Sequence, residues 1–401
     1  MLQSKHGIMK SIRYIPISLF ASIIALCAFT GCKTSHYRPA VYSYSKPLLL
    51  NDGIVVDNLD TLKSDSSKII QLTKLILADS FPNIHSLLIM KDNKLIYEHY
   101  FAGYDQNNGK NLGYIDHGAS DLHDCRSITK SVVSACIGIA IEHKFIGSID
   151  EPVFNYFPEY ARYNDSIKSK ITIRHLLTMT SGLSWNEYIS YSNPLNSEVR
   201  MNLTVDPIGF ILNRDTKYKP GSYWVYSGGN TQILAEIIKK TSGMPIDKFA
   251  EKYLFVPLGI KKFEWNGLFF KKSMPSAASG LRLTSRDMLK IGMLYMNDGN
   301  WNKQHVLTKA WANSSLSTHV ARNELKLIKK GGYGYQFWTY QETINKQTYD
   351  ITEAKGNGGN AIFFCKSLRL VVVITAGNYN NWKIKNNTYA AFCNYILPAF
   401  L

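Results

Sequence analysis

The sequence predicts an α+β fold, an α/β sandwich in which one antiparallel sheet is built from both ends of the chain. Segments rich in β-branched and apolar residues, typical of strands, lie at residues 86–100 and again at residues 348–375. Helical patterns fill most of the chain between them. Strands at both ends therefore predict a sheet closed by the two termini and flanked by helices, with a mainly helical lobe inserted.

The first residues are not expected to belong to the fold, although 401 residues with 45% apolar content are enough for a substantial core. Lys10 and Arg13 precede an apolar run at residues 15–29, which leads to Thr30-Gly31-Cys32 as in a bacterial lipoprotein signal. We therefore expect a cell-envelope protein on the extracytoplasmic, periplasmic side, held to a membrane by a lipid anchor. An ordinary cleaved signal and an uncleaved anchor are the alternatives. The predicted domains are a signal peptide over 1–31, a tether over 32–65 that starts at the lipidated Cys32, and a folded domain over 66–401.

The charge and cysteine patterns exclude two classes of partner. Removal of residues 1–31 takes away three basic residues, so the formal net charge falls from +16 to +13. The remaining lysines are scattered and no run of five or more basic residues occurs, so nucleic acid is not predicted as a partner. Cys125 and Cys136 are about 16 Å apart if both lie on one helix, too far for a disulfide. No CxxC or His-rich spacing is present, so we predict no metal and no cofactor.

The elements follow in order from the local patterns. A hairpin is predicted at residues 86–100 because Asp92-Asn93 separates two strand-like runs. A polar, Gly- and Asn-rich loop is expected over 103–123, and a central helix is expected to close near Gly147. The other predicted helices are 67–78, 173–183, 207–213, 231–241, 285–296 and 389–396, and the late strands are 348–351, 361–365 and 368–375.

The start of the central helix carries the first candidate site. The apolar residues after Asp124 predict a helix buried on nearly all sides, and Ser127 and Lys130 are three residues apart, so their side chains share one face. A serine hydroxyl becomes a good nucleophile when a base takes its proton, and a lysine can do so only in its neutral form, which burial favours. The positive end of the helix would stabilise the resulting oxyanion. A helix cap beside a solvated lysine is the competing interpretation, since Ser-x-x-Lys also occurs at residues 43–46, where no helix is expected.

Two further segments could contribute to the same chemistry. Tyr226 lies in a loop and is followed by small residues, so its hydroxyl could reach into a cleft where a cation such as Lys130 would favour its ionised form. A packed aromatic side chain is the competing interpretation in a chain with 25 tyrosines. Residues 355–360 contain three glycines before a predicted strand, so a backbone amide there could complete an oxyanion hole with that of Ser127. A simple turn is the alternative.

Together these segments resemble the penicillin-recognising serine hydrolases, which include class C β-lactamases, D-alanyl-D-alanine carboxypeptidases, esterases and aminohexanoate-oligomer hydrolases. The resemblance covers about residues 65–400 and implies a β-lactamase/transpeptidase-like fold. It rests on the order of Ser127 and Lys130, then Tyr226, then the glycine-rich strand entrance, and on residues 87–90, 126–131, 175–183, 220–221, 226–227 and 280–287.

The resemblance implies a role for each candidate residue. Ser127 is the nucleophile, Lys130 its partner, and Tyr226 the acid/base that can also activate the deacylating water. Which of Lys130 and Tyr226 takes the first proton stays open. The backbone amides of Ser127 and Asn360 form the oxyanion hole. The expected substrate contacts are Asn230, Asn357, Gly358 and Gly359.

Two departures from the family bear on the substrate. Class C β-lactamases carry Tyr-x-Asn and Lys-Thr-Gly, whereas here Tyr226-Ser227 is followed by Gly228, and residues 357–359 stand in place of Lys-Thr-Gly. Without that cation to pair with a substrate carboxylate, a less anionic substrate fits better. We predict a serine hydrolase that acts through an acyl-enzyme on a small-molecule or peptide-like ester or amide. The alternatives are a D-alanyl-D-alanine carboxypeptidase or β-lactamase, and an inactive protein that binds envelope fragments.

Overall fold

The computed structural model describes residues 42–61, 65–321, 331–381, 384 and 387–401. The predicted signal peptide, Cys32 and the first part of the predicted tether lie outside the described residues. The later part of the tether is different from the prediction, because it packs against the domain. The Tyr42 hydroxyl donates to the Tyr97 hydroxyl at 2.9 Å, and the Tyr44 hydroxyl donates to the Ile96 carbonyl at 3.0 Å. No helix within these ranges is long and apolar enough to cross a lipid bilayer.

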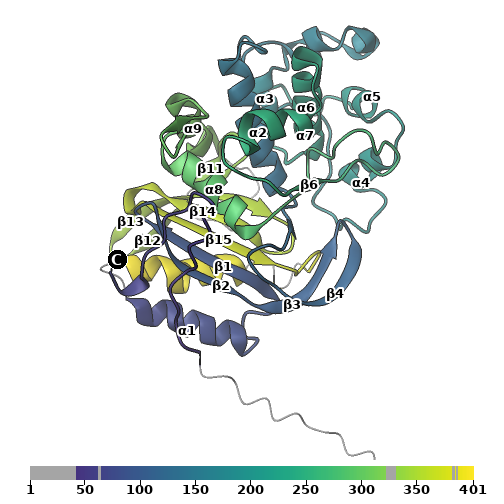
Figure 1. Cartoon of the computed structure of the whole chain (residues 1–401). Coiled ribbons are helices and arrows are strands. Elements are labelled where there is room, and N and C mark those ends of the chain that lie inside the picture. Colours follow the sequence, from purple (N-terminus) through teal and green to yellow (C-terminus); the bar gives the residue numbers. More distant parts are fainter. Residues whose placement is uncertain (1–41, 62–64, 322–330, 382–383, 385–386) are drawn as a thin grey trace, which may run out of the picture. The chain divides into compact units, whose positions relative to one another are not determined.

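An eight-stranded antiparallel sheet dominates the described residues, in the order β10-β11-β12-β13-β14-β15-β1-β2 (Figure 1). β1 comes from the N-terminal part of the chain and pairs with β15 from the C-terminal part, with Ile89 opposite Val372. The predicted sheet built from both ends of the chain is therefore confirmed. Its strands are β1 (Ile84–Lys91), β2 (Lys94–Tyr100), β10 (Val320–Ala321), β11 (Gly331–Tyr333), β12 (Trp338–Ile344), β13 (Gln347–Gly356), β14 (Asn360–Cys365) and β15 (Leu370–Ala376).

The two faces of this sheet belong to two separate hydrophobic cores, because successive side chains of a strand point to opposite faces. Leu88 and Val371 pack in the core that includes the inserted helices. Leu87 and Val372 pack in the core beneath the first and last helices of the chain. In Figure 1, α1 and the C-terminal helix cover one face of the sheet, and α8 lies on the other.

The predicted helices are present in the described residues, although the one expected over 173–183 ends at Leu177, and α4, α7 and α9 have no counterpart in the prediction. Figure 1 shows most of those between α2 and α7 gathered in the lobe beside the sheet. The α-helices of the described residues are α1 (Ser66–Leu77), α2 (Ile128–Glu142), α3 (Ile173–Leu177), α4 (Ser197–Asn202), α5 (Pro207–Leu212), α6 (Gly228–Ser242), α7 (Ile246–Ala250), α8 (Ser285–Met296), α9 (Lys309–Leu316) and α10 (Asn387–Ala391), with α10 continued by Phe392–Ile396 and Leu397–Phe400.

The predicted loop over residues 103–123 is the clearest difference from the prediction. It contains a hairpin of β3 (Ala102–Asn107) and β4 (Lys110–Asp116), followed by the short strand β5 (His123–Asp124). Asn108 and Gly109 form its turn with φ of 47° and 92°. Asn-Gly favours this turn because both positions need positive φ. The small strands β6 (Glu264–Trp265), β7 (Leu281–Leu283), β8 (Asn300–Trp301) and β9 (Gln304–His305), like β12, have no counterpart in the prediction.

The central helix α2 is buried along nearly its whole length, as predicted, although it ends at Glu142 rather than near Gly147. It contacts α6, α7 and α9 as well as β13 and β14, so it joins the helical lobe to the sheet. Gly138 permits the contact with α9, because the Trp311 ring lies where a Cβ would be.

Replacement of Gly138 by alanine should therefore lower the free energy of unfolding. The added Cβ would lie 2.5 Å from the buried Trp311 ring. Overpacking costs about 1–3 kcal/mol, more than the roughly 0.5–1 kcal/mol that alanine gains over glycine in a helix. Urea unfolding measures the difference, and adding Trp311→Leu should recover part of the loss. An unchanged or raised midpoint for Gly138→Ala alone would show that the methyl group has room.

Candidate active site

Ser127 stands at the start of α2, where the chain turns sharply out of β5. The register of β5 on β7 holds the entering segment, and the Cys125 amide donates to the Leu281 carbonyl at 2.9 Å. Arg126 has a φ of 49°, which is uncommon for a residue with a side chain. Ser127 makes no side-chain capping bond to the helix. Its hydroxyl is therefore not used as a cap, and it is partly exposed.

The Lys130 amine lies directly behind this hydroxyl. Its Nζ donates to the Ser127 Oγ at 3.1 Å and to the Ala278 carbonyl at 2.9 Å. The side chain is only 1% exposed, so the interpretation as a solvated surface lysine does not fit. The helical spacing seen in the sequence therefore produces the expected serine–lysine contact.

Tyr226 completes a group of three side chains. Its ring lies 4.9 Å from the Lys130 Nζ and stacks on Trp338 at 5.4 Å between ring centres. Its hydroxyl hydrogen-bonds with Ser127. Burial and then the charge of Glu187 raise the pKa of Tyr226 well above its usual value, and the bond with Ser127 offsets this only in part. Tyr226 is therefore a protonated phenol, not the ionised group that the sequence suggested.

Two buried glutamates face Lys130, and the sequence analysis missed both. Glu187 Oε1 lies 3.7 Å and Glu198 Oε2 3.9 Å from the Lys130 Nζ, and both residues are 4% exposed. Glu187 comes from the loop after α3, whereas Glu198 is in the first turn of α4. The two positions have no motif spacing relative to Ser127, so only the tertiary structure identifies them.

The two glutamates have pKa values shifted in opposite directions. Burial and the neighbouring Glu198 raise the pKa of Glu187 to about 8. Burial would also raise the pKa of Glu198, but Lys130 and hydrogen bonds from Glu187 and Ser279 hold it below its usual value. Burial and Glu198 thus favour the protonated form of Glu187, whereas Lys130 favours the ionised form of Glu198.

The glycine-rich segment approaches Ser127 through the end of β13. A Cβ on Gly356 would lie 2.3 Å from the Cys125 carbonyl, so the glycine permits close contact with the residues before Ser127. Asn357 follows in the turn, where its side chain donates to the Asn380 Oδ1 at 2.7 Å and accepts from the Asn380 backbone amide at 3.0 Å. Asn360, the predicted oxyanion residue, is fully buried, and its side chain bonds the backbone of Ala376.

The other predicted substrate contacts have structural partners. Asn230 is buried in the first turn of α6, where its side chain accepts from the Ser181 hydroxyl at 2.9 Å. A Cβ on Gly358 would lie 2.6 Å from the Tyr379 ring, and one on Gly359 would lie 2.7 Å from the Thr388 hydroxyl. These surroundings explain the small residues without any ligand.

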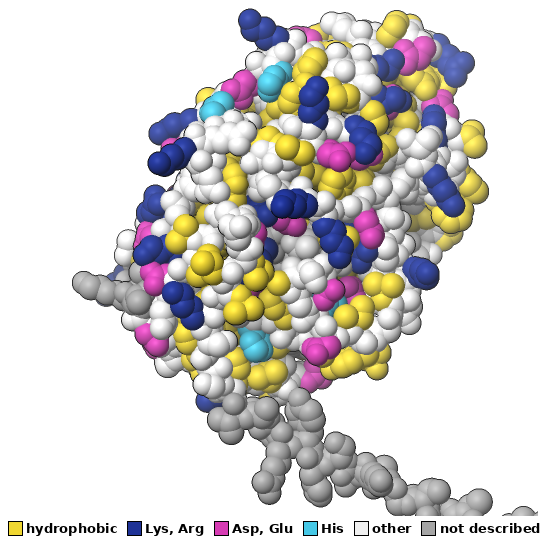
Figure 2. Space-filling model, in the orientation of Figure 1, with side chains coloured by type: hydrophobic (Ala, Val, Ile, Leu, Met, Phe, Trp, Pro, Cys, Tyr) yellow, Lys and Arg dark blue, Asp and Glu magenta, His cyan; other side chains and the backbone are white. Residues whose placement is uncertain are grey.

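The cations near the site are already paired. Arg126 lies 3.0 Å from Asp124, and Lys355 lies 3.5 Å from Glu353. Elsewhere on the visible face of the molecule, lysines and arginines are spread among acidic and neutral side chains (Figure 2). The structure thus shows no basic cluster beside Ser127 within the described ranges.

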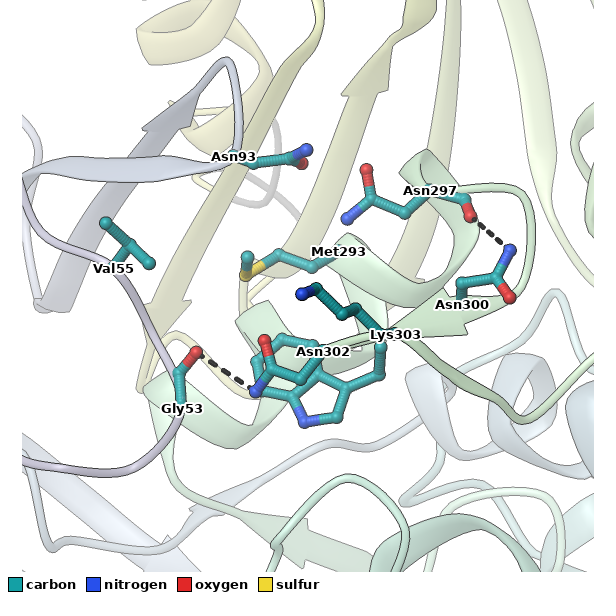
Figure 3. A pocket seen from close by; sticks show the side chains of 9 residues that line it. Gly53, Val55, Asn93, Met293, Asn297, Asn300, Asn302 and Lys303 are labelled. Atoms are coloured by element: carbon teal, nitrogen blue, oxygen red, sulfur yellow. Dashed lines mark hydrogen bonds between the residues drawn. The ribbon is translucent and has the colours of Figure 1, made fainter.

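A surface pocket of about 280 Å³ lies elsewhere, between the end of α8, the β8–β9 turn and residues 53–55 (Figure 3). Its polar lining is mainly asparagine, and Asn302 donates to the Gly53 carbonyl at 3.3 Å. No carboxylate, histidine or serine lines it. The Ser127 group is therefore the stronger candidate for chemistry.

Known proteins match the chain over most of its length. The sequence model of the β-lactamase family matches residues 85–392. A putative D-alanyl-D-alanine carboxypeptidase from Escherichia coli K12 is 25% identical over 84% of this chain and 77% of its own. The 6-aminohexanoate-dimer hydrolase of Paenarthrobacter ureafaciens is 22% identical, with 63% of each chain covered. A putative 6-aminohexanoate-dimer hydrolase from Bacillus anthracis has a similar fold, with a TM-score of 0.62, 18% identity and coverage of 89% of this chain and 88% of its own. The chain belongs to the β-lactamase family.

Proposed function

We propose that the protein is a serine hydrolase that cleaves an ester or amide through an acyl-enzyme on Ser127. The observation that supports this most directly is the 3.1 Å contact between the Lys130 Nζ and the Ser127 Oγ, with the amine buried and the hydroxyl partly exposed. A nucleophile beside a base in a partly exposed position is the arrangement that acyl transfer needs.

The charges around Lys130 support one order of proton transfers. Ser127 attacks the substrate carbonyl and its proton passes to Lys130, because the phenol of Tyr226 is already protonated. Lys130 must first be neutral, and the glutamate pair is the proton acceptor nearest to it. Tyr226 then donates a proton to the leaving alcohol or amine as the carbonyl–heteroatom bond breaks. Water attacks the acyl group in the second half, and the proton transfers run in reverse.

Oxyanion stabilisation would come from two backbone sources. The first is the amide of Ser127 at the positive end of α2. The second is the turn after β13, where Gly356 touches Cys125. We assign the second donor to the backbone amide of Asn360 at the start of β14, whose side chain is used inside the sheet.

A substrate without a free carboxylate fits the surrounding charges. Arg126 and Lys355 have carboxylate partners. Among the described residues near Ser127, no unpaired cation is therefore present to bind a substrate carboxylate. The carboxypeptidase named among the relatives favours a D-alanyl-D-alanine peptide as the second candidate. The lipoprotein-like sequence up to Cys32 supports action in the cell envelope, at a lipid-anchored position.

The nucleophile can be tested with a fluorophosphonate, which traps activated serines. The full-length wild-type protein should gain one adduct by intact mass, and Ser127→Ala should gain none. Ser131→Ala is the matched control, because Ser131 lies one turn further along α2 and donates to the Gln336 carbonyl; it should label like the wild type. An adduct on Ser127→Ala, or none on the wild type, contradicts the proposal. Penicillin in place of the fluorophosphonate separates the carboxypeptidase and β-lactamase candidates from the esterase.

The glutamate pair predicts an unusual dependence of stability on pH. The pKa of Glu187 is raised to about 8 in the folded protein, against about 4.3 in an unfolded chain. Between these values the folded state holds a proton that the unfolded state releases, so stability falls as pH rises. The stabilisation from the Glu187 proton is fully present below the unfolded pKa of about 4.3 and is lost as pH rises through the folded pKa of about 8.

Glu187→Gln should remove this decline, because the amide stays neutral at every pH. Its free energy of unfolding, measured in urea from pH 5 to 8, should decline less steeply with pH than that of the wild type. The difference between the two slopes should be at most about 1.4 kcal/mol per pH unit. Glu251→Gln, which changes a carboxylate paired with Lys248 on the surface, should keep the wild-type slope. Equal slopes for wild type and Glu187→Gln would show that Glu187 is ionised when folded.

A further inference from the structure

Three histidines and an aspartate meet beside the segment that leads into α2. His85 lies on β1, Asp105 on β3, His117 just after β4 and His123 on β5. All four side chains are buried, and one potential ligand atom from each lies within 4.8 Å of the others. Because they come from four separate parts of the fold, no local spacing in the sequence predicted a metal site.

Most of the ring nitrogens in this cluster have no hydrogen-bond partner. Both nitrogens of His117, both of His123 and the Nδ1 of His85 are unpaired and buried. The rings of His85 and His117 are stacked with their centres 4.0 Å apart. A buried polar group without a partner costs about 1–3 kcal/mol. Three such rings together therefore indicate a missing partner, an acceptor of lone pairs from several ring nitrogens at once.

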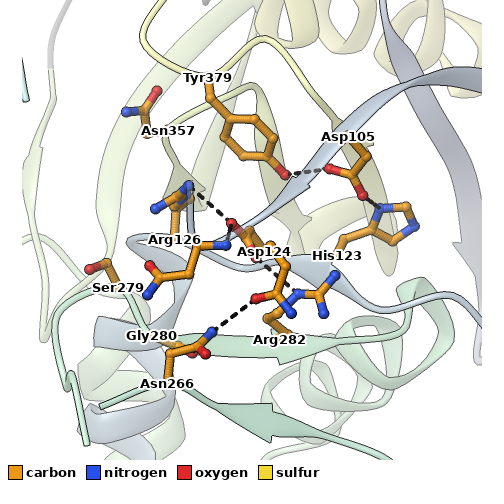
Figure 4. Close-up of polar contacts among 12 residues, drawn as sticks. Asp105, His123, Asp124, Arg126, Asn266, Ser279, Gly280, Arg282, Asn357 and Tyr379 are labelled. Carbon is orange, nitrogen blue, oxygen red and sulfur yellow. Dashed lines mark hydrogen bonds and ion pairs between the residues drawn. The ribbon is translucent and has the colours of Figure 1, made fainter. Parts of the chain in front are cut away.

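Hydrogen bonds from residues outside the cluster orient its side chains, as such bonds usually orient metal ligands. His85 Nε2 lies 3.1 Å from the Tyr104 carbonyl, so Nε2 carries the hydrogen and the lone pair on Nδ1 is free. The Tyr379 hydroxyl donates to Asp105 Oδ1 at 3.0 Å, which leaves Oδ2 free. Figure 4 shows Asp105 between Tyr379 and His123. The distance from Asp105 Oδ2 to His123 Nδ1 is 3.8 Å, too long for a hydrogen bond.

Two glycines make room for the first histidine. A Cβ on Gly103 would lie 2.8 Å from the His85 ring, and one on Gly377 would lie 2.7 Å from it. Larger residues at either place would push the ring out of the cluster. The backbone on both sides therefore fixes the position of His85, which is typical of a preformed site.

We propose that His85, Asp105, His117 and His123 bind a zinc ion. Three imidazole nitrogens and one carboxylate oxygen are a suitable ligand set for tetrahedral zinc, and four protein ligands make a closed, structural site. With bonds of about 2.0–2.2 Å, ligand atoms around zinc lie roughly 3.3–3.6 Å apart, so the side chains, which are now within 4.8 Å of one another, must rotate to close around the ion. His123 precedes Ser127 by four residues, so the ion would stiffen the segment that carries the nucleophile.

Metal content is the direct test. The full-length protein, prepared without a polyhistidine tag, would be stripped with a chelator, dialysed against zinc and then against metal-free buffer. About one zinc per chain is expected by elemental mass spectrometry, with a melting temperature that rises with zinc and falls with chelator. Cobalt loading gives a second readout, since tetrahedral Co²⁺ absorbs visible light far more strongly than the aqueous ion. A chain that retains no zinc, or a cobalt spectrum like that of the aqueous ion, overturns the proposal.

Variants locate the ion. Asp105→Asn and His117→Ala should each weaken zinc binding by at least about tenfold, and Tyr379→Phe should weaken it by about 10–100-fold through loss of the outer hydrogen bond. His99→Ala on neighbouring β2 is the control and should keep its zinc, because His99 lies outside the cluster. Undiminished binding by both cluster variants, Asp105→Asn and His117→Ala, would place any zinc elsewhere. If a variant fails to fold, the cobalt spectrum of the wild type still decides.

Discussion

The burial of the Lys130 amine is the constraint on which the active-site region depends. An amine that is 1% exposed must be hydrogen-bonded and near a compensating charge, because an isolated buried charge costs several kcal/mol. The Ala278 carbonyl and Ser127 provide the hydrogen bonds, and the Glu187–Glu198 pair provides the charge. Apart from Ser127, these partners come from separate segments of the chain, the loops that carry Glu187 and Ala278 and the first turn of α4, so those segments must pack against α2 before the site exists.

The position of α2 explains why both parts of the fold contribute. One side of the helix packs on α6 and α7 of the lobe, and the other meets β13 and β14 of the sheet. Tyr226, just before α6, reaches Ser127 from the lobe, and Gly356 at the end of β13 approaches it from the sheet. A substrate carbonyl at Ser127 would therefore meet an acid from one side and a backbone turn from the other. Movement of either part would separate the two.

The charges around Ser127 are neutralised, which supports the proposal of a substrate without a free carboxylate. The cations beside Ser127 have carboxylate partners, and the buried Lys130 is balanced by Glu198. The segment before Ser127 also contains His123, which belongs to the buried cluster of His85, Asp105, His117 and His123. The entrance to α2 therefore lies between two buried polar groups, one next to Ser127 and one that includes His123, four residues earlier.

The sequence by itself determined the elements whose signals are local. The sheet from both ends of the chain followed from its β-branched segments, the buried helix from an apolar run, and the Ser127–Lys130 contact from a three-residue helical spacing. The roles of Ser127, Lys130 and Tyr226 remain proposals drawn from that pattern. The β3–β4 hairpin was missed although its Asn108-Gly109 turn is a local signal. Only the tertiary structure brought Glu187 and Glu198 to Lys130 and assembled the histidine cluster, because these side chains meet through loop closure and strand order, which leave no fixed spacing in the sequence.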